Sequence, residues 1–91
     1  MTDANDKQQH FPLGLADRGF SGVIHRIGAA DAGSALTDVE LESRLLEMGF
    51  VEGAQVEVLH EGAIGRDPIA VRVQNITVAL RRREAMAVIV A

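Results

Sequence analysis

Apolar residues recur at helical spacing between residues 37 and 49. Three of them fall at i, i+4 and i+7, so at about 100° per residue they lie on one face of a helix. They are Leu41, Leu45 and Met48. Thr37 and Glu40 have the spacing of a capping box, which satisfies amide donors at a helix start. The pattern therefore predicts one amphipathic helix over residues 37–49, capped by Thr37.

Two glycines are expected to end this helix and reverse the chain. Gly49 follows the last residue of the apolar stripe, and glycine at that position can adopt the positive φ of a Schellman motif. Glu52-Gly53 then places a glycine at the third position of a type II turn. We predict positive φ at Gly49 and Gly53, with a strand starting directly after them.

Five segments alternate between apolar and polar residues with the period of two that is typical of half-buried strands. They are residues 20–27, 54–60, 68–73, 76–80 and 86–90. In the first, the spacing of Gly22, Ile24 and Ile27 breaks the strict period of two, which favours a bulge or a strong bend. Gln74-Asn75 is predicted to form a tight hairpin turn, with Asn75 in the left-handed conformation.

The segments between these strands read as short turns. Residues 12–19 are expected to form a turn or helical wrap that packs Leu13 and Leu15, and residues 81–85 a turn or 3₁₀ piece. Short strands joined by tight turns most economically close into a small antiparallel barrel. We therefore predict a mainly β protein, a small antiparallel barrel of about five strands, with one α-helix between the first and second strands.

Composition is consistent with one small domain. The chain has 91 residues, of which 47% are hydrophobic, and it has three Phe but no Trp or Tyr, so the core must be aliphatic. Residues 1–10 are polar and lack periodicity, which predicts a disordered tail followed by a single domain over residues 11–91.

Charge and cysteine content narrow the function classes. Cysteine is absent, which excludes disulfides and thiolate metal sites and favours a cytoplasmic location. No apolar run approaches the ~20 residues of a membrane-spanning helix, so no direct membrane insertion is expected. The formal charge of −4 argues against a nucleic-acid partner, because neutralised phosphates supply most of that affinity.

Ionisable residues do not form a recognisable active site. The histidines lack the spacing of a preformed metal site, and the carboxylates lack a pocket that would tune them for acid/base catalysis. The residues considered are His10, His25, His60, Glu52, Glu57, Glu61 and Asp67. His60 continues the alternation of its strand and is expected to cap the core at the strand end. We predict no catalytic, cofactor-binding or metal-binding residue, and hence no enzyme.

Two surface features are candidates for partner binding. Val39 and Leu46 lie about 130° around the predicted helix from its buried stripe, where an isolated domain would gain little from apolar side chains. A wide buried arc under the N-terminal segment is the alternative. Arg81, Arg82 and Arg83 form the only concentrated positive charge in an acidic chain. They suit either a solvated turn or docking on an acidic protein surface.

The segment 44–90 resembles the FeoA family of ferrous-iron uptake accessory proteins. The family's hallmarks are a helix that ends in R-L-x-x-M-G, a second Gly shortly after that helix, a loop with the pattern G-x-D-P-[IL], and a C-terminal segment with the pattern A-L-R-x-x-E-A. They stand here as Arg44, Leu45, Met48, Gly49, Gly53, Gly65, Asp67, Pro68, Ile69, Ala79, Leu80, Arg81, Glu84 and Ala85. Residues 20–27 resemble the family's first strand, so the likeness covers about residues 12–91. The resemblance implies an SH3-like barrel, in which Gly65, Asp67 and Pro68 shape a turn.

The resemblance also implies a function. FeoA-like proteins act in the cytoplasm on FeoB, the membrane ferrous-iron transporter with a GTP-binding domain, so a non-enzymatic adaptor recruited to the inner face of the membrane is expected. The alternative is a metal-responsive regulatory module, because similar SH3-like domains end some metal-dependent repressors. Self-association into a homo-oligomer is left open.

Overall fold

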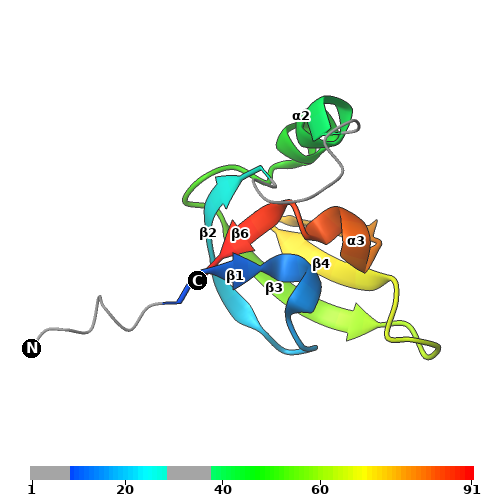
Figure 1. The fold of residues 1–91 in the computed structure, drawn as a ribbon. Coiled ribbons are helices and arrows are strands. Elements are labelled where there is room, and N and C mark those ends of the chain that lie inside the picture. The colour runs from blue at the N-terminus through cyan, green and yellow to red at the C-terminus, as the bar shows by residue number, and fades with distance from the viewer. Residues whose placement is uncertain (1–8, 29–37) are drawn as a thin grey trace, which may run out of the picture.

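The computed structural model describes residues 9–28 and 38–91 of the chain, and within them it contains six strands, two α-helices and one 3₁₀ helix (Figure 1). The strands are β1 (Phe11–Pro12), β2 (Ser21–Ile27), β3 (Gln55–Glu61), β4 (Ile69–Val73), β5 (Ile76–Leu80) and β6 (Val88–Val90). The helices are η1 (Leu13–Leu15), α2 (Asp38–Met48) and α3 (Arg82–Ala85). Most of the predicted tail and the predicted cap Thr37 lie outside the described residues.

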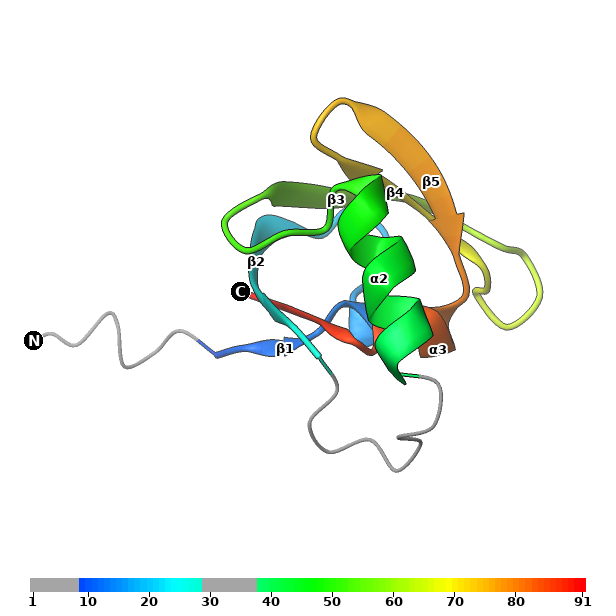
Figure 2. The same ribbon diagram turned by 90° about the horizontal axis from the view of Figure 1, so that it is seen from above.

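All neighbouring strands pair antiparallel, in the order β1-β6-β2-β3-β4-β5. β2 changes partner along its length: residues 21–23 pair with β3, and residues 24–27 pair with β6 across a register shift between Ile24 and Arg26. This shift confirms the bulge or bend expected in the first long strand. Because a bulge increases local twist, it lets the sheet curl into the small barrel seen in Figure 2.

The core is almost entirely aliphatic, as the composition predicts. Alternate residues of β4 are buried and line the barrel interior, namely Ile69, Val71 and Val73. The only aromatic side chain among the fully buried described residues is Phe50, which is 0% exposed. α2 packs Leu45 into the same core, with Leu41 and Met48 partly buried beside it, which confirms the predicted stripe.

The end of α2 is a Schellman motif. The Phe50 N–H donates to Leu45 O at 3.0 Å, and the Gly49 N–H donates to Leu46 O at 3.0 Å. Gly49 has φ 107°, and Gly53 has φ 88° in a turn that the Ala54 N–H closes on Val51 O at 3.0 Å. Both predicted positive-φ glycines are confirmed, and the stop turns the chain directly into β3.

Alanine at Gly49 or at Gly53 is expected to lower the free energy of unfolding by about 1 kcal/mol each, because a Cβ disfavours the left-handed region. Space is not the cause, since a Cβ at Gly53 would meet nothing within 4 Å and one at Gly49 would make ordinary van der Waals contacts, the nearest with Gln74 Cγ at 3.4 Å. Chemical denaturation of both variants measures the effect. Unchanged midpoints in both would contradict this account of the turn.

Some elements differ from the sequence-based expectation. The two-residue β1 pairs with β6 and was not predicted, so six strands replace about five. Residues 82–85 form a four-residue α-helix rather than a 3₁₀ turn. In the 74–75 hairpin Gln74, not Asn75, has the positive φ, at 58°.

Several apolar side chains are more exposed than alternation suggests. The packing expected of residues 12–19 is confirmed for Leu13, which is fully buried, and wrong for Leu15, which is 64% exposed because η1 turns it outward. Ile76, the first residue of β5, is 49% exposed, and Met86, which follows α3, is 37% exposed. None of the described helices is long and apolar enough to cross a membrane.

Candidate functional site

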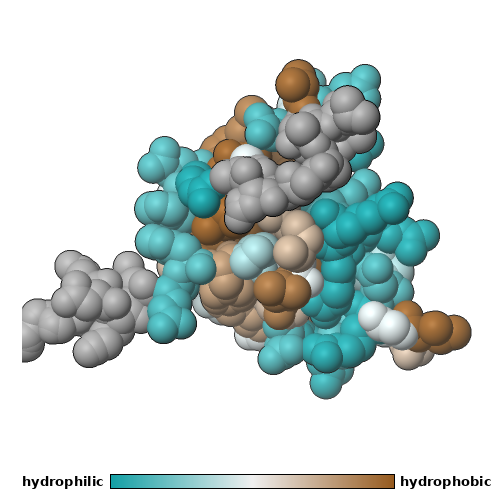
Figure 3. Space-filling model, viewed as in Figure 1, coloured by the Kyte–Doolittle hydropathy of each residue, from teal (hydrophilic) through white to brown (hydrophobic). Residues whose placement is uncertain are grey.

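The outer face of α2, defined by Val39 and Leu46, is an exposed apolar surface. Val39 is 78% exposed and Leu46 is 48% exposed, whereas Leu45 on the stripe that faces the core is fully buried. The alternative of a wide buried arc under the N-terminal segment is therefore wrong for these two side chains. Figure 3 shows apolar side chains exposed among polar ones in the region of α2. Apolar side chains at i and i+7 suit recognition of a helix by a groove.

The neighbours of the outer face are mainly acidic or polar. Glu42 and Ser43 flank it on the same helix, and the exposed Glu40 and Glu47 lie further round. Arg44 is the one basic residue of α2, and it forms an ion pair with Glu84 of α3, with 3.3 Å between Arg44 Nη2 and Glu84 Oε2. That pair links α2 to α3 and leaves the acidic side chains of α2 as the charged border of its outer face.

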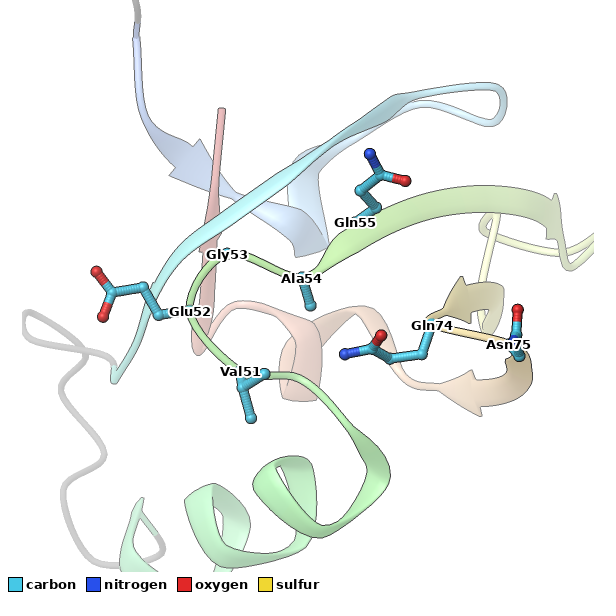
Figure 4. Close-up of a pocket in the computed structure, with 7 residues that line it drawn as sticks. All are labelled: Val51, Glu52, Gly53, Ala54, Gln55, Gln74 and Asn75. Carbon is cyan, nitrogen blue, oxygen red and sulfur yellow. The ribbon is translucent and has the colours of Figure 1, made fainter.

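A shallow, open hollow lies beside the C-terminal end of α2, between the 51–55 turn and the 74–75 hairpin. Its volume is about 580 Å³, and its lining comprises Val51, Glu52, Gly53, Ala54, Gln55, Gln74 and Asn75 (Figure 4). In this close-up Gln74 points toward Ala54, whereas Glu52 points away from the other side chains. Because Glu52 is the only carboxylate in the lining, the hollow has no paired acid and base.

The three consecutive arginines differ sharply in environment. Arg81 and Arg83 are exposed. The Arg82 side chain is only 17% exposed, and Nη1 donates to Gly14 O at 3.0 Å and to Ala16 O at 2.7 Å. Arg82 therefore belongs to an internal network and cannot also dock a partner without breaking it.

The same guanidinium reaches the loop between β3 and β4. Arg82 Nε donates to Arg66 O at 2.7 Å, and Arg82 Nη2 lies 3.0 Å from Glu61 Oε1. The backbone N–H of Arg82 donates to Asp67 Oδ1 at 2.8 Å, which secures the start of α3. We call this set of contacts the Arg82 clamp; it joins η1, the 62–68 loop and α3.

The 62–68 loop has the turn geometry expected of Gly65, Asp67 and Pro68. Gly65 and Arg66 both have positive φ, at 71° and 61°, and the Asp67–Pro68 peptide is cis. The Arg66 side chain donates hydrogen bonds to Asp17 and Glu61, and these bonds raise the pKa of Arg66 above its usual value, with Asp17 contributing most. Ile64 at the tip is 89% exposed, a feature that sequence alternation did not identify.

The candidate metal ligands are scattered over the described residues. His10 and His25 stack with ring centroids 3.9 Å apart, and His60 is exposed beyond a register shift in β3 rather than capping the core. Within residues 9–28 and 38–91, no three His, Cys, Asp or Glu side chains come together as a metal-binding group. The acidic candidates Glu61 and Asp67 serve instead as partners in the Arg82 clamp.

Comparison with solved structures gives consistent neighbours. FeoA from Stenotrophomonas maltophilia in complex with zinc is 31% identical, with a TM-score of 0.70, over 89% of this chain and 89% of that one. That protein is described as a prokaryotic SH3 domain protein and a candidate ferrous iron transport activating factor. Iron(II) transport protein A from Clostridium thermocellum is 29% identical, with a TM-score of 0.69, over 88% of this chain and 44% of that one.

A further neighbour is a manganese-dependent transcriptional repressor in complex with manganese. It is 21% identical, with a TM-score of 0.74, over 93% of this chain and 37% of that one, and at this identity it shares the fold alone. No curated protein sequence matched the chain. The FeoA domain family matches residues 11–91, so the chain belongs to the FeoA family and has its SH3-like fold.

Proposed function

We propose that this protein is a small non-enzymatic adaptor of ferrous-iron uptake, which acts in the cytoplasm by contact with an FeoB-type transporter. Membership of the FeoA family supports a role in iron transport. The relative from S. maltophilia, described as a candidate transport activating factor, supports the same role. A chain that works through contact needs an exposed recognition surface rather than a catalytic pocket.

The outer face of α2 is the observation that carries this proposal. Val39 and Leu46 keep 78% and 48% of their surface exposed although the same helix buries Leu45 completely. Covering such side chains with a partner removes apolar area from water, at about 25 cal/mol per Å². The surrounding carboxylates would orient the partner and disfavour acidic competitors.

Arg81 and Arg83 are proposed as a second, electrostatic contact. Both are exposed on the segment that begins α3, whereas the Arg82 clamp retains the middle arginine. Exposed charges of this kind steer encounter more than they add affinity. We therefore narrow the basic part of the proposed surface to Arg81 and Arg83, and expect its contribution to weaken as salt increases.

Leu46→Asp is expected to weaken binding to the soluble cytoplasmic domain of the transporter by at least about tenfold, since a charge in the centre of an apolar contact must be desolvated. The thermal midpoint should change little, because Leu46 is half exposed. Interferometry with the immobilised transporter domain measures the affinity, and a thermal melt of the same samples measures stability.

Leu15→Asp is the matched control. Leu15 is 64% exposed on η1, so the substitution makes the same chemical change on a different element and should leave binding intact. Equal losses in both variants, or undiminished binding by Leu46→Asp, would refute the proposed contact. Unfolding of Leu46→Asp would assign Leu46 to the core and refute it as well.

The alternative function is a metal-responsive regulatory module. It is supported by the fold shared with the manganese-dependent repressor, and fold alone does not supply ligands. The described residues lack a group of three metal-ligating side chains, so the adaptor function is preferred. Stoichiometric binding of ferrous iron that is lost on changing His25 or His60 would favour the alternative.

A further inference from the structure

β5 is the last strand of the sheet and has a partner, β4, along one edge only. The orientation of its backbone groups follows from the register. The Val58 N–H donates to Phe20 O at 2.9 Å, so the backbone N–H and C=O of Val58 point away from β4. Val58 and Val71 on β4 are therefore a pair without hydrogen bonds between them. Bonds alternate along an antiparallel strand, so Val71 must exchange hydrogen bonds with Val78 on β5.

The residues on either side of Val78 therefore point their backbone groups outward. Thr77 and Ala79 each carry one N–H and one C=O that face away from β4. The outward N–H and C=O groups of Thr77 and Ala79 make no other hydrogen bond among the described residues. The side chains of both residues are exposed. Figure 2 shows β5 at the periphery of the sheet, on the side of β4 away from β3.

This edge lacks the features that usually protect an edge strand. Residues 76–80 contain no charge and no proline, and the β4–β5 register has no shift. Natural proteins protect exposed edges with lysine, proline, bulges or a covering element, because free N–H and C=O groups recruit another strand. Ile76 is 49% exposed and Val78 is half-buried, so apolar surface accompanies the unpaired backbone.

We propose that β5 is a self-association edge, on which a second copy of this chain pairs its own β5 antiparallel about a two-fold axis at Val78. In this register Thr77 lies opposite Ala79 of the second copy, and Ala79 lies opposite Thr77. Each such pair exchanges two backbone hydrogen bonds, so every outward N–H and C=O of Thr77 and Ala79 acquires a partner. The sheet then continues across both copies.

The side chains suit this register. On the inner face Val78 meets Val78 of the second copy, and the exposed Ile76 lies opposite Leu80, so most of the added apolar contact comes from Val78 and Ile76 because Leu80 is already buried in its own core. On the outer face Thr77 meets Ala79, so no like charges oppose each other. Arg81 would lie opposite Asn75, an uncharged residue. A heterologous peptide would need its own matching sequence, whereas a second copy already supplies it.

The contact is small, and association is therefore weak and dependent on concentration. A single pair of five-residue strands buries less than the ~1,200 Å² of a typical stable interface. The proposed register uses residues of β5 alone, so it requires no contact from Val39 and Leu46 on the outer face of α2. This inference does not depend on the proposed adaptor function.

A pair of double variants tests the register by sedimentation velocity over a concentration series. Thr77→Lys with Ala79→Lys places like charges opposite each other at both pairs and is expected to raise the dimer dissociation constant by roughly tenfold or more. Thr77→Lys with Ala79→Glu places opposite charges there and should retain or tighten the dimer. Both variants change the same two exposed positions, and thermal melts check that both are folded.

A wild-type chain that stays monomeric up to millimolar concentration would overturn the proposal. So would a Lys/Lys variant that associates like wild type. Equal loss of association in the Lys/Lys and Lys/Glu variants would also overturn it, because the register about Val78 predicts opposite effects.

Discussion

Replacing Phe50 by alanine is expected to lower the free energy of unfolding by about 3–5 kcal/mol, the cost of emptying a large buried site. Phe50 is 0% exposed, and it lies where the Schellman motif joins α2 to the core. The other two phenylalanines, Phe11 and Phe20, are only partly buried, so neither can take its place. Because small domains have total stabilities of only about 5–15 kcal/mol, much of the Phe50→Ala protein should be unfolded at moderate temperature.

Chemical denaturation of Phe50→Ala and Phe50→Leu measures this effect. Leucine retains most of the apolar volume, so its loss should be clearly smaller than that of alanine. If both variants lost less than about 1 kcal/mol, Phe50 would not be a principal core residue.

Replacing Arg82 by methionine is expected to cost about 2–3 kcal/mol, because hydrogen bonds to a charged group that is shielded from water are strong and several acceptors lose their donor together. Methionine keeps an unbranched apolar stem like that of arginine and removes the guanidinium group, with its charge and its donors. The acceptors left behind include Gly14 O, Ala16 O and Arg66 O. Three separate segments would lose the contact that joins them.

Arg83→Met is the matched control for this substitution. Arg83 is the next residue along α3 and is exposed, so its replacement should change stability by no more than about 0.5 kcal/mol. Thermal and chemical denaturation of the two variants give the comparison. Similar losses at Arg82 and Arg83 would show that the Arg82 clamp does not stabilise the fold.

The sequence predicted those features whose causes are local. The stripe of Leu41, Leu45 and Met48 depends on spacing within one helix, and the φ of Gly49 and Gly53 depends on turn types that span four to six residues. Both features can therefore be predicted from a short stretch of the sequence. The exposure of Val39 and Leu46 follows from the same helical geometry, although their role in binding is a proposal.

The features that the sequence did not predict depend on distant contacts. Arg82 was grouped with two exposed arginines, but its acceptors Gly14 O and Ala16 O lie 68 and 66 residues away in the chain. No local pattern distinguishes it from Arg81 and Arg83. β1 has only two residues, too few to show alternation, and exists because β6 pairs with it from the far end of the chain.

The most direct test of the central claim is a titration of isotope-labelled protein with the unlabelled cytoplasmic domain of an FeoB-type transporter, followed by amide chemical shifts. The account predicts saturable changes centred on the residues around Val39 and Leu46 of α2, with smaller ones near Arg81 and Arg83. An absence of changes at concentrations of both proteins well above micromolar, or changes confined to β3 and the 62–68 loop, would contradict it.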